Sequence, residues 1–278
     1  MNNVCSSRLT IAVFLLFAVL SLEAQHSCGT VVSPDYIQKE KELQKKMLLK
    51  AFTSQYPDKI NRSFEITAYV LTQDSGVIKL MTDSIDKINK AFEPIGMSFK
   101  ICRYIFPRDS AYTISDEVTR KETDALYNTP RTINMFFVNG LISGGTDACG
   151  MAYMTWTEDY NSIYIKCIET VTIIHELGHF FGLYHPHDTK YFGSELADSS
   201  NCATTGDLIC DTPADPNLLT MTGPGCTYTG NVRDYKGHSY VPQIGNFMAY
   251  SSGCGCFFTP GQYQKMVLHY YVYKSYLR

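Results

Sequence analysis

The sequence predicts an α+β fold in which a twisted, mixed, five-stranded sheet is backed by two helices and followed by an irregular half that ends in a helix. Up to residue 185, short β-branched and apolar runs alternate with segments of helical periodicity. Residues 186–256 are rich in Gly, Pro, Asp, Asn, Ser, Thr and Cys, which is typical of irregular structure. Hydrophobic residues make up 45% of the 278 residues, enough for the core of one sizeable domain.

The individual helices and strands follow from local patterns. Residues 79–92 carry apolar side chains at helical spacing and form the first backing helix; the second leads into residue 175. The last helix covers residues 261–273, with Thr259 as its N-cap and Pro260 at its first position. The predicted strands cover residues 64–71, 97–106, 133–138, 150–155 and 162–168, and residues 116–128 form either a polar helix or a loop.

Residues 1–24 have the features of a secretory signal peptide. Arg8 precedes an apolar run over residues 9–20, which is too short to span a bilayer comfortably, and Ala24 supplies a small-residue cleavage site. The alternative is an uncleaved membrane anchor. No other stretch of the sequence is long and apolar enough to cross a membrane, so we expect a secreted or periplasmic protein without stable membrane association.

The charge pattern argues against a nucleic-acid partner. The net charge is −3 and the sequence pI is about 6.2. Lys and Arg are scattered, apart from a run of lysines within residues 39–50, so no extended basic surface is expected. Nothing in the sequence specifies an oligomeric state, and a monomer is the simplest expectation.

The strongest signal is an H-E-x-x-H-x-x-G-x-x-H motif that begins at His175. His175 and His179 are four residues apart on one helix face, so their imidazoles can bind the same zinc ion. Gly182 can adopt a left-handed conformation that ends the helix and turns the chain, which brings His185 back as a third ligand. Glu176 is placed to reach a water on the metal without being a ligand itself.

Three protein ligands leave a fourth position for water, which is typical of a catalytic rather than a structural zinc site. We therefore expect one zinc ion, with Glu176 taking a proton from the water and passing it to a leaving amine. His187 is an alternative third ligand, although the spacing favours His185. The other interpretation of the histidine pair is two buried core residues, which explains neither the glycine nor the third histidine.

The extended motif resembles that of the metzincin metalloproteases. Residues 246–250, Asn-Phe-Met-Ala-Tyr, are similar to the methionine turn of these enzymes. The resemblance covers about residues 64–278 and implies a metzincin-like zincin fold and an endopeptidase that acts on proteins or peptides. Three further stretches are similar to the pappalysin (cytophagalysin) family, namely residues 182–185, 206–213 and 258–262.

The resemblance also implies roles for particular residues. Met248 forms an apolar floor below the metal ligands. The hydroxyl of Tyr250 helps to stabilise the oxyanion of the reacting carbonyl, unless Tyr250 is simply one of the chain's twenty tyrosines with a structural role. The strand at residues 150–155 is the sheet edge to which a substrate peptide adds through main-chain hydrogen bonds.

A latent precursor is expected by the same resemblance, because metzincins are commonly made in latent form. Residues 25–62 then form a pro-segment ahead of a catalytic domain at residues 63–278, and residues 35–52 within it are charged and loosely helical. The alternative is a helix that stays docked on the domain. Cys28 stands alone before the domain, and its thiolate can fill the fourth zinc position, as cysteine switches do in some metzincins. Otherwise Cys28 forms a disulfide or is free.

Asp207, Asp211 and Thr212 lie in a segment where pappalysin-like enzymes bind calcium, so the resemblance implies calcium as a second metal. Oxygen ligands in an irregular loop suit this ion. The alternative is that these side chains make local turn and capping hydrogen bonds.

The chain has ten cysteines, of which Cys5 leaves with the signal peptide, so an odd number enters an oxidising compartment. Cys102, Cys149 and Cys167 are buried thiols, or two of them pair. The resemblance suggests two disulfides in the irregular half, which join Cys202 with Cys226 and Cys210 with Cys254 or Cys256.

We therefore expect a secreted zinc-dependent endopeptidase of the pappalysin type. Two other functions remain open on the sequence. One is an amidase that uses the same site on non-protein substrates. The other is a secreted zinc-binding protein without turnover, against which the presence of Glu176 argues, because binding alone does not need that carboxylate.

Overall fold

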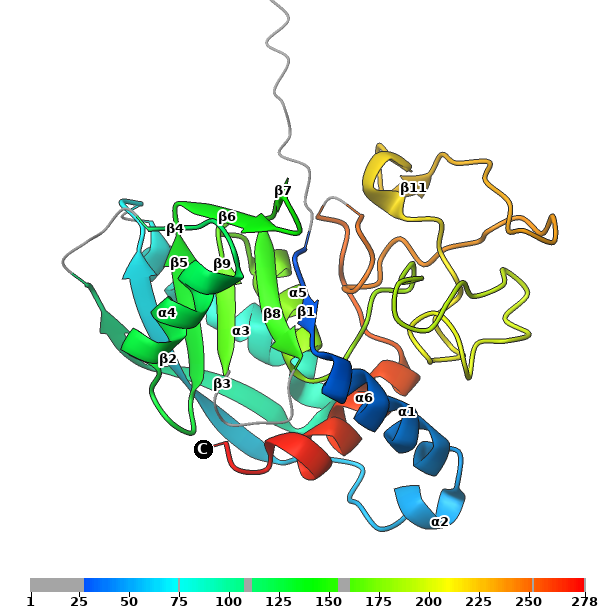
Figure 1. The fold of residues 1–278 in the computed structure, drawn as a ribbon, viewed down its shortest axis with the longest axis horizontal. Helices are drawn as coiled ribbons and strands as arrows, with labels where there is room; N and C mark the ends of the chain where they lie inside the picture. Colours follow the sequence, from blue (N-terminus) through cyan, green and yellow to red (C-terminus); the bar gives the residue numbers. More distant parts are fainter. Residues whose placement is uncertain (1–27, 75, 108–111, 155–160, 252, 278) are drawn as a thin grey trace, which may run out of the picture.

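The centre of the molecule is a six-stranded mixed sheet in the order β1-β8-β9-β5-β2-β3 (Figure 1). The computed structural model describes residues 28–74, 76–107, 112–154, 161–251 and 253–277. Strands β9, β5, β2 and β3 are parallel, β8 is antiparallel to β9, and β1 is parallel to β8. The strands are β1 (Val31–Val32), β8 (Gly150–Met154), β9 (Ser162–Ile165), β5 (Ile133–Val138), β2 (Arg62–Leu71) and β3 (Met97–Ile105).

Helices α3 (Val77–Phe92) and α5 (Thr170–Phe180) pack on one face of this sheet. Their apolar side chains share one buried core with the strands, as Phe92 of α3 and Leu177 of α5 illustrate. The α+β class, the five strands of the main domain and the two backing helices are therefore confirmed. The sixth strand, β1, comes from the N-terminal segment and was not expected.

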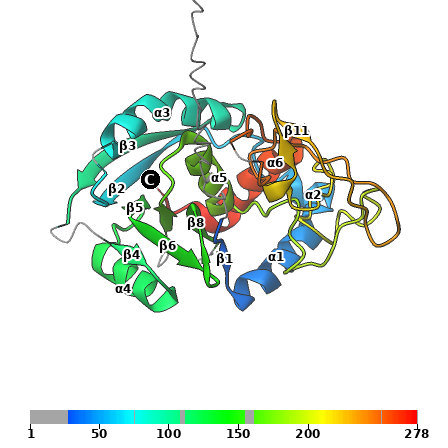
Figure 2. The ribbon, with the colours of Figure 1, turned by 90° about the horizontal axis from the view of Figure 1, so that it is seen from above.

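Helix α4 (Glu117–Tyr127) covers the opposite face, which resolves the choice between a polar helix and a loop in favour of a helix (Figure 2). Asp116 caps it by accepting a hydrogen bond from the Thr119 amide. Its inward face is polar: Asp124 is buried and accepts hydrogen bonds from Ser162 and Tyr164. Because this face is not apolar, hydrophobic periodicity alone did not identify the helix.

Helix α6 (Pro260–His269) begins where the sequence predicted, and Thr259 and Gln262 form a reciprocal capping box at its start. A π-helical turn, η4 (Tyr270–Lys274), continues it. The remaining elements are α1 (Pro34–Met47), α2 (Lys50–Thr53), η1 (Glu93–Ile95), β4 (Thr113–Ile114), β6 (Gly140–Ser143), β7 (Thr146–Asp147), η3 (Leu218–Thr220), β10 (Thr222–Gly223) and β11 (Thr227–Tyr228).

Residues 186–256 are irregular apart from η3, β10 and β11, as expected. The suggested disulfide pairing is wrong, however, because the structure joins Cys202 to Cys210 and Cys226 to Cys254. The seven residues between Cys202 and Cys210 turn back on themselves and bring the two Cα atoms to 5.0 Å, within the range that a disulfide requires. Cys256 is exposed and unpaired.

A third disulfide joins Cys149 to Cys167, whose Cα atoms are 4.7 Å apart. These residues lie at the adjacent ends of the antiparallel strands β8 and β9, so the sheet itself brings them together. The open choice between buried thiols and a disulfide is thus settled for this pair. Cys28 is unpaired, and Cys102 is a free but exposed thiol, so the expectation that it is buried or paired is wrong.

Residues 28–53, the N-terminal part that the structure describes, lie against the rest of the molecule (Figure 1). Helix α1 buries Tyr36, Glu40, Leu43 and Gln44, and β1 adds to the edge of β8. The predicted signal peptide lies outside the described residues. Within the described ranges, no helix combines the length and apolar character needed to span a bilayer.

Candidate active site

Helix α5 carries the first two histidines of the motif, and residues 172–180 of this helix are all buried. The helix ends at Phe180, and Gly182 then takes a φ of +94°. A Cβ atom at this position would lie 2.5 Å from the His269 ring, so both the backbone angle and the close packing require glycine. The turn returns the chain so that His185 faces the helix.

The three motif histidines converge on one point. The distance between Nε2 atoms is 3.0 Å for His175 and His179, 2.9 Å for His179 and His185, and 3.2 Å for His175 and His185. The opposite nitrogens, Nδ1, of His175 and His179 lie 2.7 Å from the Phe247 carbonyl and 2.6 Å from the Leu183 carbonyl. A carbonyl accepts only from N–H, so Nδ1 carries the proton and the Nε2 lone pairs point at one another.

This arrangement fits a metal ion. Burial lowers the pKa of His175 to about 4 and puts the pKa values of His179 and His185 well below the ordinary value, so all three are neutral at pH 7. Three lone pairs about 3 Å apart repel unless a cation lies among them. A tetrahedral zinc ion with bonds of about 2.0–2.1 Å holds its nitrogens roughly 3.3 Å apart, close to the observed spacing.

A fourth group, the Cys28 thiol, completes the cluster. One ligand atom from each of Cys28, His175, His179 and His185 lies within 4.8 Å of the others. The alternative ligand His187 stacks on the His185 ring at 4.7 Å, and its Nδ1 is 3.6 Å from an Asp215 carboxylate oxygen. His187 therefore lies beside the cluster and faces away from its centre.

Glu176 lies on α5 beside the cluster and is only 1% exposed. Neither of its carboxylate oxygens makes a hydrogen bond of regular geometry with another described residue. Burial raises its pKa to about 8, an effect that the neighbouring Cys28 thiol opposes. Gly150 opens β8 next to this carboxylate, and a Cβ there would lie 2.4 Å from Glu176 Oε1. Glycine at the strand end thus leaves room for the acid.

The methionine turn, residues 246–250, packs against helix α5. Met248 is fully buried, and a Cβ on Gly178 of α5 would lie 2.5 Å from its sulfur. The Asn246 side chain accepts a hydrogen bond from the Met248 amide and exchanges hydrogen bonds with the Gln262 side chain of α6. The turn is thus fixed to a helix that lies far along the chain.

Tyr250 follows this turn, and its ring centroid is 4.6 Å from that of His185. Its hydroxyl accepts a hydrogen bond from the Cys28 amide and donates one to the Cys28 carbonyl, both at 2.9 Å. Burial raises the pKa of Tyr250, so the hydroxyl keeps its proton. Sequence analysis did not predict this contact, because Cys28 and Tyr250 are 222 positions apart in the chain.

The N-terminal residues occupy the sheet edge next to the histidines. The Gly29 amide donates to the Gly150 carbonyl at 2.9 Å, and Ser143 Oγ donates to the Gly29 carbonyl at 2.9 Å. A Cβ on Gly29 would lie 2.2 Å from Ser143 Cβ, so this position accepts only glycine. The edge strand predicted to bind substrate is therefore covered by the chain's own residues.

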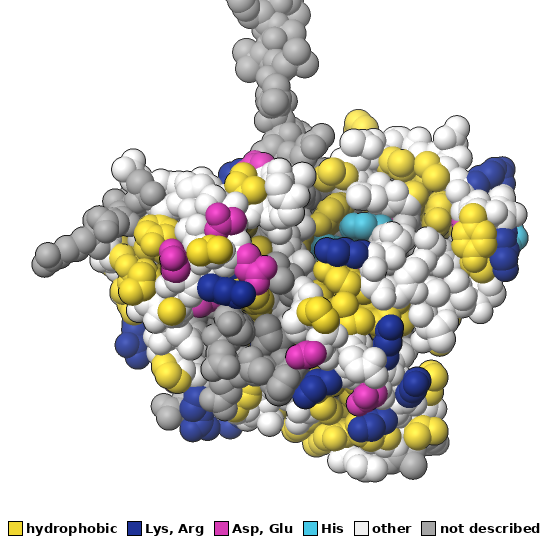
Figure 3. Space-filling model, in the orientation of Figure 1, with side chains coloured by type: hydrophobic (Ala, Val, Ile, Leu, Met, Phe, Trp, Pro, Cys, Tyr) yellow, Lys and Arg dark blue, Asp and Glu magenta, His cyan; other side chains and the backbone are white. Residues whose placement is uncertain are grey.

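A cleft of about 620 Å³ is lined in part by Cys28, and its lining also includes His187, Asp215, Val232 and Tyr240. Figure 3 shows a histidine side chain at the surface between the sheet and the irregular half. The residues of this cleft come mainly from segments without regular structure, so sequence patterns did not identify them.

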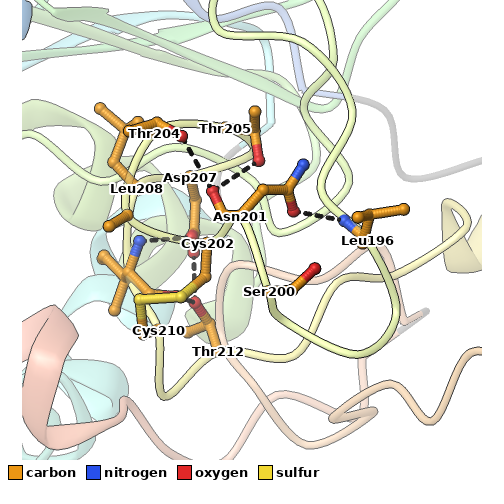
Figure 4. Close-up of a disulfide and its surroundings, with 12 residues drawn as sticks. Leu196, Ser200, Asn201, Cys202, Thr204, Thr205, Asp207, Leu208, Cys210 and Thr212 are labelled. Carbon is orange, nitrogen blue, oxygen red and sulfur yellow. Dashed lines mark hydrogen bonds between the residues drawn. A yellow bond between two sulfur atoms is a disulfide. The ribbon is translucent and has the colours of Figure 1, made fainter.

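The predicted calcium residues lie in two places. Asp207 is fully buried and accepts hydrogen bonds from the Ile209 amide and the Thr212 hydroxyl, beside the Cys202–Cys210 disulfide (Figure 4). Asp211 instead accepts hydrogen bonds from the Thr259 hydroxyl and the Gly261 amide at the start of α6.

Glu195 is a further acidic residue that sequence reasoning missed. It is 4% exposed, and neither carboxylate oxygen has a hydrogen-bond partner among the described residues. Burial, with help from Asp207 and Asp215, raises its pKa to about 8. A single Glu in an irregular stretch carries no spacing signal, so only the tertiary structure places it next to Asp207.

Comparisons with known proteins agree with this site. Residues 115–270 match the family model of peptidase M43, described as pregnancy-associated plasma protein-A. The extracellular metalloprotease of Arthroderma gypseum is 26% identical over 270 residues, covering 88% of this chain and 84% of that protein. The extracellular metalloprotease of Neurospora crassa is 25% identical over 276 residues, covering 90% of this chain and 89% of that protein.

Among solved structures, metalloproteinase-II from Bacteroides fragilis aligns with a TM-score of 0.35 and 11% identity over 48% of this chain and 46% of that one. This likeness is too weak to support any argument. The match to the family model, by contrast, spans more than half of the chain. The chain therefore belongs to the pappalysin family, peptidase M43, and is a metalloendopeptidase.

Proposed function

We propose that this secreted metalloendopeptidase uses zinc, with Glu176 as its general base, and is made as a latent precursor with residues 28–32 as the latch. The observation that supports the site most strongly is the convergence of three neutral imidazoles beside a buried carboxylate without regular hydrogen bonds. Such an unsatisfied set is unfavourable in a folded protein unless it serves binding or catalysis.

Zinc is the metal that this donor set suits best. Three imidazole nitrogens with a possible thiolate are typical zinc ligands, whereas calcium and magnesium require oxygen. His175, His179 and His185 would hold the ion. A bound zinc ion supplies Lewis acidity and lowers the pKa of water towards about 7.

Glu176 accepts a proton from the attacking water and passes it to the nitrogen of the leaving amine. The hydroxyl of Tyr250 donates a hydrogen bond to the carbonyl oxygen of the substrate as negative charge develops there. Burial supports both roles, because hydrogen bonds and charges act more strongly where water is excluded. Met248 keeps a structural role below the ligands.

Latency follows from what the latch occupies. Cys28 lies in the metal cluster, its backbone engages the Tyr250 hydroxyl, and β1 covers the edge of β8 where a substrate peptide would add. Burial and the Glu176 carboxylate raise the pKa of the Cys28 thiol well above its ordinary value, and a bound cation would favour the thiolate instead. Residues 1–24 remain the proposed signal peptide.

We also propose a calcium ion in the irregular half, held by Asp207, Thr212 and Glu195. The two unpartnered oxygens of Glu195 beside the buried Asp207 carboxylate are the supporting observation. Calcium prefers such carboxylate and hydroxyl or carbonyl oxygens. Asp211, the other predicted ligand, uses both oxygens at the start of α6.

The test of the proposed function is casein hydrolysis by the activated enzyme, with Glu176→Ala beside it and Glu122→Ala, an exposed residue of α4, as the matched control. We expect the native enzyme and the control to cleave casein, and a zinc chelator to stop both. Glu176→Ala should retain stoichiometric zinc in elemental analysis while its kcat falls by at least about 10³-fold, in the upper range for general base catalysis.

A Glu176→Ala enzyme that cleaves casein at the native rate would contradict the assignment of the base. Metal-depleted enzyme that regains activity with another divalent ion, but not with zinc, would contradict the choice of metal.

A further inference from the structure

We infer that helix α1 remains part of the active enzyme and that activation cuts the chain between Val32 and Pro34, which releases the latch alone. This inference rests on the proposed latency, because it concerns which part of the N-terminal segment leaves. The sequence predicted that the whole of residues 25–62 would be removed, whereas this inference limits the removed part to the residues before α1.

Helix α1 is packed as a core element. Tyr36 is 0% exposed, and its hydroxyl is 2.7 Å from Nε2 of His269 on α6. Gln44, one turn past Glu40 on the same face, donates hydrogen bonds to the Ala203 and Leu208 carbonyls of the irregular half. The helix therefore joins α6 to the irregular half.

A buried ion pair lies at the centre of this contact. Glu40 Oε1 on α1 is 2.8 Å from Lys265 Nζ on α6, and both side chains are 0% exposed. Lys265 also donates to the Asp207 carbonyl at 3.2 Å. Removing one partner of a buried pair leaves an uncompensated charge, which is strongly destabilising. Loss of α1 would leave Lys265 without its carboxylate.

The latch, residues 28–32, is held mainly by main-chain hydrogen bonds and by the Cys28 thiol, and it contributes no residue to the buried ion pair. Apart from the Cys28 thiol in the metal cluster and the packing of Val32, its contacts are the two Cys28 hydrogen bonds with Tyr250, the Gly29 hydrogen bonds with Gly150 and Ser143, and the two-residue β1 pairing. The start of α1 also does not depend on the latch, because residues outside the latch cap the helix. Ser33 caps α1 by accepting from the Tyr36 amide at 3.2 Å, and Pro34 is its first residue.

The position of the cut follows from accessibility. Ser33 and Pro34 are exposed, whereas the helix beyond them is folded and buries one face. Hydrolysis here adds one water, leaves a new carboxylate on the latch and a new amine at the start of α1, and frees the latch to dissociate. The exposed stretches between α1 and the body of β2, such as residues 57–59, all follow α1. A cut there would leave the latch joined to a helix still held by Glu40.

The first experiment identifies the active species. The purified full chain is activated by limited proteolysis, separated by size exclusion under native conditions, and the casein-cleaving fraction is characterised by N-terminal sequencing and intact mass. We expect one polypeptide whose N-terminal residue is Ser33 or Pro34. An active species that begins after Tyr36 overturns this inference and leaves the latency proposal intact. An active species that retains Cys28 overturns both.

The second experiment asks whether Glu40 still supports the activated enzyme. We expect Glu40→Gln to lower the Tm of both the latent and the activated forms by roughly 10 °C, as loss of a buried partner should. Glu42→Gln, on the exposed face of the same helix, should leave both Tm values unchanged. A native Tm in activated Glu40→Gln overturns the inference.

If Glu40→Gln does not fold, Tyr36→Phe answers the same question, because it keeps the ring and removes only the hydrogen bond with His269. It should lower the Tm of the latent and activated forms by the same few degrees. A decrease in the latent form alone would mean that α1 has left.

Discussion

His175 and His179 are each oriented by a backbone carbonyl behind the imidazole, and both carbonyls lie C-terminal to α5, at Leu183 and Phe247. This second layer fixes which nitrogen is protonated and therefore which nitrogen faces the metal. The carbonyls come from the Gly182 turn and the methionine turn. These two turns therefore prepare the metal site as well as shaping the chain.

Tyr250 provides a prediction at the scale of one residue. Tyr250→Phe should lower kcat of the activated enzyme by about 10²-fold and leave KM nearly unchanged, because loss of one oxyanion donor weakens only transition-state binding. Steady-state kinetics on a fluorogenic peptide measures this. Tyr235→Phe, at a site 72% exposed, is the control. A variant with native kcat would show that the hydroxyl serves only to hold the latch.

Lys274, on the π-helical turn η4, makes the stability of the folded protein depend on pH. It is fully buried over the Phe180 ring, 3.4 Å from the Asn161 and Tyr276 side-chain oxygens, and burial lowers its pKa to about 7. The ordinary lysine pKa is about 10.4, so between pH 7 and 10 the unfolded chain binds more protons than the folded one. This group therefore makes the folded protein more stable as pH rises through that window.

We expect Lys274→Met to remove this contribution, which amounts to at most ~1.4 kcal/mol of unfolding free energy per pH unit. Denaturant unfolding at pH 7.5, 8.5 and 9.5 compares the variant with native protein and with Lys87→Met, an exposed control on α3. Equal slopes for native and Lys274→Met would show that this lysine is charged in the folded protein.

The irregular half provides the next prediction, because it has little regular structure and depends on two disulfides and the proposed calcium ion. Millimolar calcium should raise the Tm by several degrees at pH 7.5, since ten times the Kd corresponds to about 1.4 kcal/mol of stabilisation. Glu195→Gln should abolish most of the rise, and magnesium should give much less. A calcium response unchanged in Glu195→Gln would place the ion elsewhere.

At the scale of the whole molecule, the sheet edge, the metal cluster and the proposed oxyanion donor, Tyr250, are all contacted by one short segment, the latch. A synthetic peptide with the sequence of residues 28–33 should therefore inhibit the activated enzyme. Replacing its cysteine by serine should weaken inhibition by about tenfold or more, or ~1.4 kcal/mol. Replacing its glycine by alanine should abolish inhibition, because a Cβ there would meet Ser143 at 2.2 Å.

The measurement is the inhibition constant of each peptide against casein hydrolysis, with a scrambled peptide as control. If the serine peptide inhibits as well as the cysteine peptide, the thiol does not bind the metal and latency is purely steric.

Local sequence patterns were enough to predict much of this molecule's secondary structure and its metal-binding motif. The strands, the backing helices and the capping of α6 follow from apolar periodicity and from residues such as Thr259 that act within one turn. The histidine motif is equally local, because helical spacing and the Gly182 turn bring its ligands together within eleven residues. Physical chemistry acting over a few residues was therefore sufficient to predict the fold class and the metal cluster.

Only the tertiary structure decided the contacts between residues far apart in the chain. The cysteine pairing depended on how an irregular loop folds, and the position of Glu195 beside Asp207 carries no sequence signal. The attachment of α1 through Glu40 and Lys265 joins residues separated by most of the chain. Such contacts depend on the packing of the whole molecule, in which a buried charge is tolerated only where its partner is brought to meet it.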